Sequence, residues 1–124
     1  MVCPFCDMDK LEIVLSNDLA FAIFDKYPVN SGHLLIIPFR HFSSWFNATK
    51  EEREAILELI DRAKVYIDDN FSPDGYNLGI NVGELAGQTI FHLHVHLIPR
   101  YKGDIDDPTG GVRGVIPEKR IYKR

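Results

Sequence analysis

Apolar residues in the first third of the chain occur in short runs that polar turn residues separate. Residues 12–15 and 19–24 flank the tripeptide Ser-Asn-Asp, and residues 33–37 form a third run that ends at Pro38. Short apolar runs bounded by Asn, Asp, Gly and Pro are typical of β-strands. The pattern therefore predicts three strands in this region, the first two of them joined by a turn.

The pattern changes to a helical one at Thr49. Thr49 and Glu52 have the spacing of a capping box, in which each side chain hydrogen-bonds a free backbone N–H at the helix start. The apolar residues that follow share one face of a helix: Ile56, Leu59, Ile60, Ala63 and Ile67. We therefore predict a helix over about residues 50–70 that packs on the core and carries no chemistry.

The second half of the chain returns to strand patterns. Residues 76–82 form one, and in residues 88–100 histidines alternate with apolar residues: His92, His94 and His96 with Leu93, Val95 and Leu97. A period of two is typical of a strand with two unlike faces, and it spaces the imidazoles ~6.6 Å apart. Three buried imidazoles in a row would need partners for every ring nitrogen and would repel one another when charged. We therefore expect the imidazole face to point into a site.

The order of the elements, strands then helix then strands, predicts the fold class. It favours an α+β fold in which an antiparallel sheet of about five strands packs against one long helix. A chain of 124 residues has room for one domain with a substantial core but not for two, so we expect a single domain over residues 1–124. Residues 101–124 contain glycine and proline without a helical period, which indicates a C-terminal loop or tail.

Charge and hydropathy narrow the classes of partner. The formal net charge of −4 provides no global positive field, which argues against nucleic acid but permits a small anion held by local donors. The apolar runs are far too short to cross a membrane, so we expect no membrane partner. The N-terminus has neither the basic start nor the apolar segment of a signal peptide, so we expect a cytoplasmic protein.

The chain contains 2 cysteines, Cys3 and Cys6, in a C-x-x-C knuckle within residues 1–10. In a cytoplasmic protein this spacing favours metal or redox chemistry over a structural disulfide. Tetrahedral structural zinc needs four nitrogen or sulfur ligands, so histidines would supply the other two. A redox pair is the alternative, less favoured because no helix pattern follows Cys6. A pair of free thiols is the third interpretation.

The stretch FHLHVHLIPR resembles the motif of the histidine triad (HIT) family, in which His-x-His-x-His precedes apolar residues. The segments SGHLLIIPFRHFS, NVG and AGQT fit the family in the same order, so the resemblance covers about residues 21–100. The N-terminal CPFC is similar to a zinc-bearing branch. The resemblance implies a HIT-like fold, a two-fold homodimer that extends the sheet, and a nucleotide substrate.

Nucleotidyl transfer needs a nucleophile, groups that hold phosphate oxygens and a proton for the leaving group. Neutral imidazole is a nucleophile near pH 7, and a hydrogen bond from its other ring nitrogen to a backbone carbonyl would fix the attacking nitrogen. The resemblance implies that His94 attacks the α-phosphorus and becomes covalently nucleotidylated, while His96 contacts the phosphate oxygens and His92 completes the catalytic triad. Water would then release a nucleoside monophosphate.

The C-terminal sequence indicates the branch of the family. The stretch IPRYKGD…GGVRGVIPEK resembles dinucleoside-polyphosphate hydrolases more than phosphoramidases, whose tail contains tryptophan, because no tryptophan follows Trp45. We therefore expect a hydrolase or transferase acting on the α-phosphate of a dinucleoside polyphosphate or related conjugate. The alternatives are a nucleoside phosphoramidase and a nucleotide-binding scaffold with vestigial activity. A metal hydrolase using all three triad histidines is disfavoured, because such a row spans ~13 Å.

The resemblance also assigns the binding residues. It implies a structural zinc site formed by Cys3, Cys6, His41 and His92. It implies a nucleotide site formed by Asp25, Asn81, Gly87, Gln88, Thr89, His94 and His96, in which Asp25 binds the ribose hydroxyls. A turn-forming role for Asp25 and for the glycines is the alternative.

Three assignments stay open at this level. The base is expected to lie between apolar residues, with Phe5, Phe21, Ile23 and Ile37 as the candidates. His33 either hydrogen-bonds the triad or is a satisfied core histidine. The C-terminal cations either hold distal phosphates or form a solvated tail: Arg100, Lys102, Arg113, Lys119, Arg120, Lys123 and Arg124.

Overall fold

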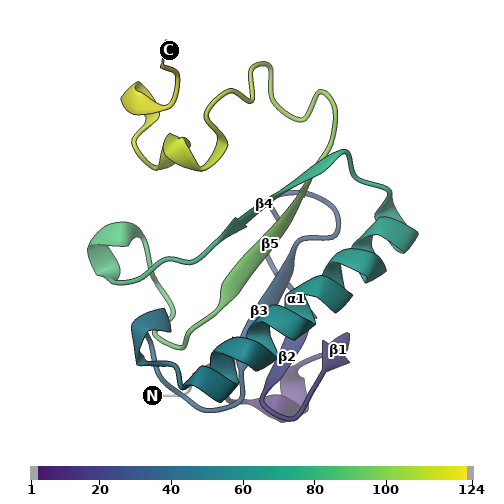
Figure 1. Ribbon diagram of the computed structural model, residues 1–124, viewed down its shortest axis with the longest axis vertical. Coiled ribbons are helices and arrows are strands. Elements are labelled where there is room, and N and C mark those ends of the chain that lie inside the picture. Colours follow the sequence, from purple (N-terminus) through teal and green to yellow (C-terminus); the bar gives the residue numbers. More distant parts are fainter. Residues whose placement is uncertain (1–2, 123–124) are drawn as a thin grey trace.

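The computed structural model describes residues 3–122 and is drawn in Figure 1. Its strands are β1 (Leu15–Ser16), β2 (Ala20–Phe24), β3 (Leu34–Pro38), β4 (Gly75–Gly79) and β5 (Val95–Arg100). One α-helix, α1 (Lys50–Phe71), separates β3 from β4. Short 3₁₀ turns are η1 (Met8–Lys10), η2 (Trp45–Asn47), η3 (Glu84–Ala86), η4 (Gly111–Val115) and η5 (Pro117–Lys119).

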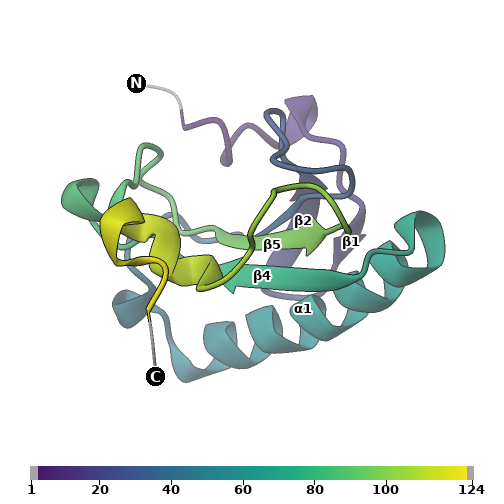
Figure 2. The ribbon, with the colours of Figure 1, turned by 90° about the horizontal axis from the view of Figure 1, so that it is seen from above.

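The five strands form one antiparallel sheet in the order β1-β2-β3-β5-β4. Helix α1 covers one face of this sheet, and the N-terminal segment lies on the opposite side, as Figure 2 shows. The predicted α+β fold, with about five antiparallel strands and one long helix, is confirmed. Among residues 3–122, no helix combines the length and apolar character needed to cross a lipid bilayer.

Helix α1 begins at the capping box that the sequence predicts. The Thr49 hydroxyl accepts a hydrogen bond from the Glu52 N–H, and the Glu52 carboxylate accepts one from the Thr49 N–H. The predicted apolar stripe packs on the sheet, with four members fully buried and Ile60 partly buried: Ile56, Leu59, Ala63 and Ile67. The helix ends at Ser72, whose left-handed backbone (φ 51°) stops further helical hydrogen bonding.

The neighbouring strands β2 and β3 are buried on both faces, which explains their unbroken apolar sequence. One face of β2 and β3 meets α1 through Ala20, Ala22, Leu34 and Ile36. The other face forms a second apolar cluster with the N-terminal segment: Phe5, Phe21, Ile23, Leu35 and Ile37. This second cluster lies directly beneath the candidate site.

The strand that carries the histidines is shorter than the alternation predicts. Strand β5 begins at Val95, so only His96 of the triad belongs to it, while His92 and His94 lie in the segment before the strand. Pro38 has no N–H to continue the ladder with this segment, and its carbonyl accepts a hydrogen bond from the His92 ring (2.8 Å). The Leu93 N–H instead donates to the Phe42 carbonyl (2.7 Å). The triad therefore sits where the chain leaves the sheet.

Two other boundaries differ from the prediction. The strand expected over residues 76–82 is β4 (Gly75–Gly79), whose last pair is Gly79 with His96, because β5 offers little strand beyond that point. The C-terminal stretch, expected to be a loop, contains the 3₁₀ turns η4 and η5. Their short length leaves no helical period to detect in the sequence.

Candidate functional site

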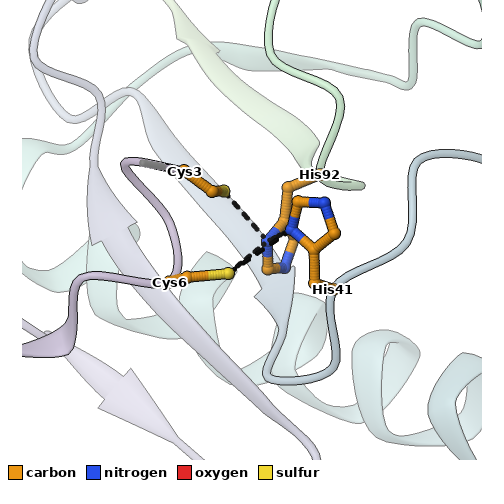
Figure 3. Close-up of side chains that lie close together, drawn as sticks. All are labelled: Cys3, Cys6, His41 and His92. Carbon is orange, nitrogen blue, oxygen red and sulfur yellow. Dashed lines mark hydrogen bonds between the residues drawn. The ribbon is translucent and has the colours of Figure 1, made fainter. Parts of the chain in front are cut away.

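Four side chains from three separate segments converge near the end of β3 and the start of β5: Cys3, Cys6, His41 and His92 (Figure 3). The Nδ1 atom of His92 lies 3.4 Å from the Cys3 sulfur, 3.5 Å from the Cys6 sulfur and 3.2 Å from Nδ1 of His41. The Cys6 sulfur lies 3.4 Å from Nδ1 of His41. Ligands of a tetrahedral zinc ion, at Zn–S of about 2.3 Å and Zn–N of about 2.0–2.1 Å, would lie about 3.3–3.8 Å apart. The donor set and its spacing therefore fit zinc.

The ring of His92 is held in the form that a metal ligand requires. Its Nε2 donates to the Pro38 carbonyl oxygen at 2.8 Å, so in the neutral ring the lone pair lies on Nδ1, which faces the two sulfurs. Burial lowers the pKa of His92, and the ring is fully buried, so the neutral form is favoured at pH 7. His92 thus belongs to a metal-ligating group formed by Cys3, Cys6, His41 and His92, and it does not line the neighbouring cavity.

His94 lines a cavity of about 710 Å³ on the face of the sheet opposite α1. Its Nδ1 lies 2.8 Å from the backbone carbonyl oxygen of His92, which can only accept a hydrogen bond, so Nδ1 carries the proton. The lone pair of the neutral ring is therefore on Nε2. An imidazole that attacks phosphorus needs this arrangement, because the attacking nitrogen must carry the lone pair.

His96 and His33 form a hydrogen-bonded pair whose proton positions follow from the backbone. The Val29 N–H donates to Nδ1 of His33 (3.0 Å), so the neutral His33 ring carries its proton on Nε2. That Nε2 lies 3.0 Å from Nδ1 of His96, which accepts the hydrogen bond, and so His96 carries its proton on Nε2. Burial lowers the pKa of His96 to about 4, and His94 and His33 add to this effect. His96 is therefore a neutral hydrogen-bond donor at pH 7.

His33 is thus hydrogen-bonded to His96 of the triad, and it is also a buried histidine in which both ring nitrogens have hydrogen-bond partners. Asp25 lies nearby, with a carboxylate oxygen 3.5 Å from Nε2 of His33, and it accepts a hydrogen bond from the Tyr27 N–H (2.9 Å). Asp25, His33 and His96 are close enough for metal ligation. However, Nε2 of His33 carries a proton and is not a ligand in this arrangement.

The structure brings six of the predicted nucleotide-binding residues to one cavity: Asp25, Asn81, Gly87, Thr89, His94 and His96. Two of the base-binding candidates, Phe5 and Ile23, also line it, whereas Phe21 and Ile37 lie beneath it in the apolar cluster. Sequence reasoning missed Lys10 and Lys26, the cations among the described lining residues. Lys26 directly follows the predicted site residue Asp25, so its position beside Asp25 is a signal in the sequence. No sequence pattern indicates Lys10.

Gln88 does not line the cavity, in contrast to the prediction. Its side chain is 3% exposed, and its Oε1 accepts a hydrogen bond from the Gly83 N–H (2.9 Å). Its Nε2 donates to the carbonyl oxygens of Ser43 (3.0 Å) and Ile90 (3.1 Å). Both amide protons are thus used within the protein, and Gln88 supports the loops around the site.

The described C-terminal cations lie away from the histidine cavity. Arg100 pairs with Asp104 and Asn77, and Arg120 donates to the carbonyl oxygens of Asp107 and Thr109. Arg100 and Lys102 line a different cavity of about 650 Å³, beside β4. Arg113 and Lys119 are not among the residues lining the histidine cavity, and Lys123 and Arg124 lie outside the described residues.

The antiparallel sheet with one long helix, the histidine-lined cavity and the adjacent cluster of two cysteines and two histidines agree with the family that sequence comparison identifies. The HIT domain model matches residues 9–103. The chain belongs to the HIT family.

Two curated relatives carry names that specify an activity. The AP-4-A phosphorylase of Mycobacterium tuberculosis is 34% identical over 123 residues, which cover 93% of this chain and 63% of that protein. The bis(5'-adenosyl)-triphosphatase of Dictyostelium discoideum is 35% identical over 96 residues, 77% of this chain and 64% of that protein. The chain thus spans less than two thirds of the length of either relative.

A solved structure with the same fold is the zinc-bound histidine triad family protein of Mycobacterium smegmatis. It superposes with a TM-score of 0.75 at 29% sequence identity, covering 84% of this chain and 78% of that one.

Proposed function

We propose that the protein is a nucleotide hydrolase or transferase that acts on the α-phosphate of a dinucleoside polyphosphate through a nucleotidyl-His94 intermediate. One observation carries this proposal: the His94 ring faces the cavity with its Nδ1 proton fixed on the His92 carbonyl oxygen, 2.8 Å away. The names of the two curated relatives, both of which specify adenosine dinucleotides, support the substrate class.

The lining of the cavity supports a nucleotide as its occupant. The Asp25 carboxylate would accept hydrogen bonds from the ribose diol, and the apolar wall of Phe5, Ile23, Leu35 and Ile90 would cover the base. Asn81, Thr89 and the backbone at Gly87 would donate to phosphate oxygens, because Gly87 has a left-handed backbone (φ 97°) and no side chain in the way. Lys10 and Lys26 would attract the remaining negative charge.

The reaction would proceed in two displacements at the same phosphorus. Nε2 of His94 attacks the α-phosphorus, a P–N bond forms, and the P–O bond to the leaving nucleotide breaks. The positive charge that develops on the His94 ring is stabilised by the hydrogen bond from Nδ1 to the His92 carbonyl oxygen. Nε2–H of His96 donates to a phosphate oxygen. Water then attacks phosphorus, the P–N bond breaks, and a nucleoside monophosphate and a proton are released.

The metal-ligating group would hold a structural zinc ion through Cys3, Cys6, His41 and His92. Bound zinc would cross-link the N-terminal segment to the end of the histidine segment and supply no reacting group. His94 would remain free for the reaction, since its own nitrogen atoms take no part in that cluster.

We also propose a homodimer. The edge strand β4 is only partly buried, and it carries the exposed apolar side chain of Leu78. Leu57 and Val65 are further exposed apolar residues, on α1. Light scattering is expected to give twice the mass of the chain, and a monomer at micromolar concentration would contradict this arrangement.

The proposed reaction is tested by hydrolysis of diadenosine tetraphosphate in water enriched in ¹⁸O. Attack at the α-phosphorus places the heavy oxygen in adenosine monophosphate, and attack at the β-phosphorus places it in the triphosphate product. We expect the label in the monophosphate, and His94→Ala should abolish turnover. Faster turnover of an adenosine phosphoramidate would favour the phosphoramidase assignment. Nucleotide binding without turnover of either substrate would favour a scaffold.

A further inference from the structure

Phe5 lies between the two cysteines and reaches both candidate sites with one side chain. It is 6% exposed and packs in the apolar cluster with Phe21, Ile23, Leu35 and Ile37. Its ring meets the ring of His94 edge-on, with centroids 5.2 Å apart, and the ring of His92 with centroids 5.9 Å apart. The same ring lines the histidine cavity.

The segment that carries Phe5 has few other attachments to the sheet. Within the described chain, the backbone hydrogen bonds of residues 3–11 all close turns inside that segment: Cys6 to Cys3, Met8 to Cys6, Lys10 to Asp7, and Leu11 to Met8. The segment is joined to the body by apolar packing and by the approach of the cysteine sulfurs to His41 and His92. Figure 2 shows this segment lying over the sheet, opposite α1.

We infer that Phe5 is a positioning residue that couples the metal-ligating group to His94 and to the nucleotide cavity. Metal bound by Cys3 and Cys6 fixes the residues between them, and so fixes the Phe5 ring against His94 and the cavity wall. Without the metal, the segment loses its cross-link, the wall loosens, and nucleotide binds more weakly. This inference rests on the proposed nucleotide-binding function.

The coupling is reciprocal by thermodynamic linkage. If metal strengthens nucleotide binding by a given factor, bound nucleotide strengthens metal retention by the same factor. Couplings between two sites typically span about 5- to 150-fold. An aromatic pair contributes about 0.5–1.5 kcal/mol, so we expect a coupling of up to about tenfold. The coupling should vanish when the Phe5 ring is removed, even though all four metal ligands remain.

The test measures adenosine monophosphate binding by calorimetry and zinc release to a chromophoric chelator on the full chain. Wild type, Phe5→Ala and the control Met8→Ala are each loaded with one equivalent of zinc. Met8 lies in the same segment but is partly exposed and does not line the cavity. Wild type and Met8→Ala are expected to bind the nucleotide about tenfold more weakly after zinc removal. Phe5→Ala should bind zinc stoichiometrically yet show the same nucleotide affinity with and without it.

The reverse measurement starts from zinc-loaded protein, so no metal-free sample has to be prepared. Nucleotide should reduce equilibrium zinc transfer to the chelator by about tenfold in wild type and not in Phe5→Ala. The ¹⁵N imidazole signals of His94 should also shift in Phe5→Ala, which a purely structural role of the ring elsewhere would not cause. If wild type binds the nucleotide with the same affinity with and without zinc, the coupling is overturned and the proposed function is not. Failure of zinc-loaded wild type to bind any nucleotide overturns both the coupling and the proposed function.

Discussion

Nε2 of His33 lies 3.0 Å from Nδ1 of His96, and this contact sets the direction in which His96 donates. The chain of donors begins at the Val29 N–H, passes through the His33 ring and ends at the Nε2–H of His96. A backbone amide in the loop before β3 therefore determines which nitrogen of a triad histidine faces the cavity with a proton. The arrangement makes His33 a positioning residue for the proposed phosphate contact.

Replacing His33 by Phe should lower kcat by about 100-fold, at the lower end of the contribution of about 10²- to 10⁴-fold that a positioned acid–base group makes. The His96 ring would lose the partner that fixes its tautomer, while the Asp25 and apolar walls of the cavity would remain. KM should therefore change much less than kcat. Steady-state kinetics with diadenosine tetraphosphate measures both. A loss confined to KM would show that His33 serves substrate binding and not the orientation of His96.

The histidine pair also predicts a pH dependence. Burial lowers the pKa of His33 and lowers that of His96 to about 4, against an ordinary value near 6.5. Since both folded-state pKa values lie below the unfolded ones, the unfolded state takes up protons first. Stability is then complete above about pH 6.5 and is lost as the pH falls toward about 4.

Imidazole ¹⁵N spectra of the zinc-loaded protein test this directly. At pH 5.5 the His96 ring should still be neutral, with its proton on Nε2. The His96→Asn variant identifies the signals. Titration of His96 near pH 6.5 would contradict the hydrogen-bonded, buried arrangement described above.

Metal removal should lower thermal stability. A ligand that binds only the folded state stabilises it by about 4 kcal/mol at a thousand times its dissociation constant. Cys3→Ala and Cys6→Ala should each lower Tm and remove the sensitivity of Tm to a strong chelator. An unchanged Tm of wild-type protein after chelation, with zinc release verified by mass spectrometry, would exclude a structural zinc site at these residues.

Gln88 and Thr89 are neighbours in sequence with different expected roles. Gln88→Leu removes three hydrogen bonds of a buried side chain and leaves the Gly83 N–H without its acceptor. The free energy of unfolding should therefore fall by about 1–3 kcal/mol. Thr89→Val should leave stability within about 0.5 kcal/mol and weaken nucleotide binding. Urea denaturation and nucleotide titration of both variants separate the two effects. A loss of nucleotide binding without a loss of stability in Gln88→Leu would show that Gln88 binds the nucleotide.

The sequence predicts the parts of this molecule that depend on local pattern. Helix α1 is predictable because the Thr49–Glu52 capping box and the apolar stripe lie within one stretch of chain. Strands β2 and β3 are predictable because both of their faces are buried, which makes their sequences continuous apolar runs. The start of the histidine strand is not, because it depends on Pro38 and Phe42, whose carbonyl oxygens accept hydrogen bonds from a segment about 50 residues later.

The candidate site shows the same division. The triad and the cysteine knuckle are visible as motifs, and the resemblance to the HIT family joins them to His41 and Asp25. The proton positions on His94 and His96 depend on contacts with the His92 carbonyl oxygen and with His33. The position of Phe5 and Lys10 over the sheet depends on where the N-terminal segment folds back. Neither relationship has a periodicity or spacing in the sequence.

The central proposal is the covalent role of His94, and intact-protein mass spectrometry under non-acidic quenching tests it most directly. Wild type and His94→Ala would be mixed with diadenosine tetraphosphate and sampled during turnover, with native spectra recording bound zinc. We expect wild type alone to gain the mass of one adenylyl group, and both proteins to retain zinc. Turnover by His94→Ala, without any adduct on wild type, would contradict the assignment of His94 as the nucleophile.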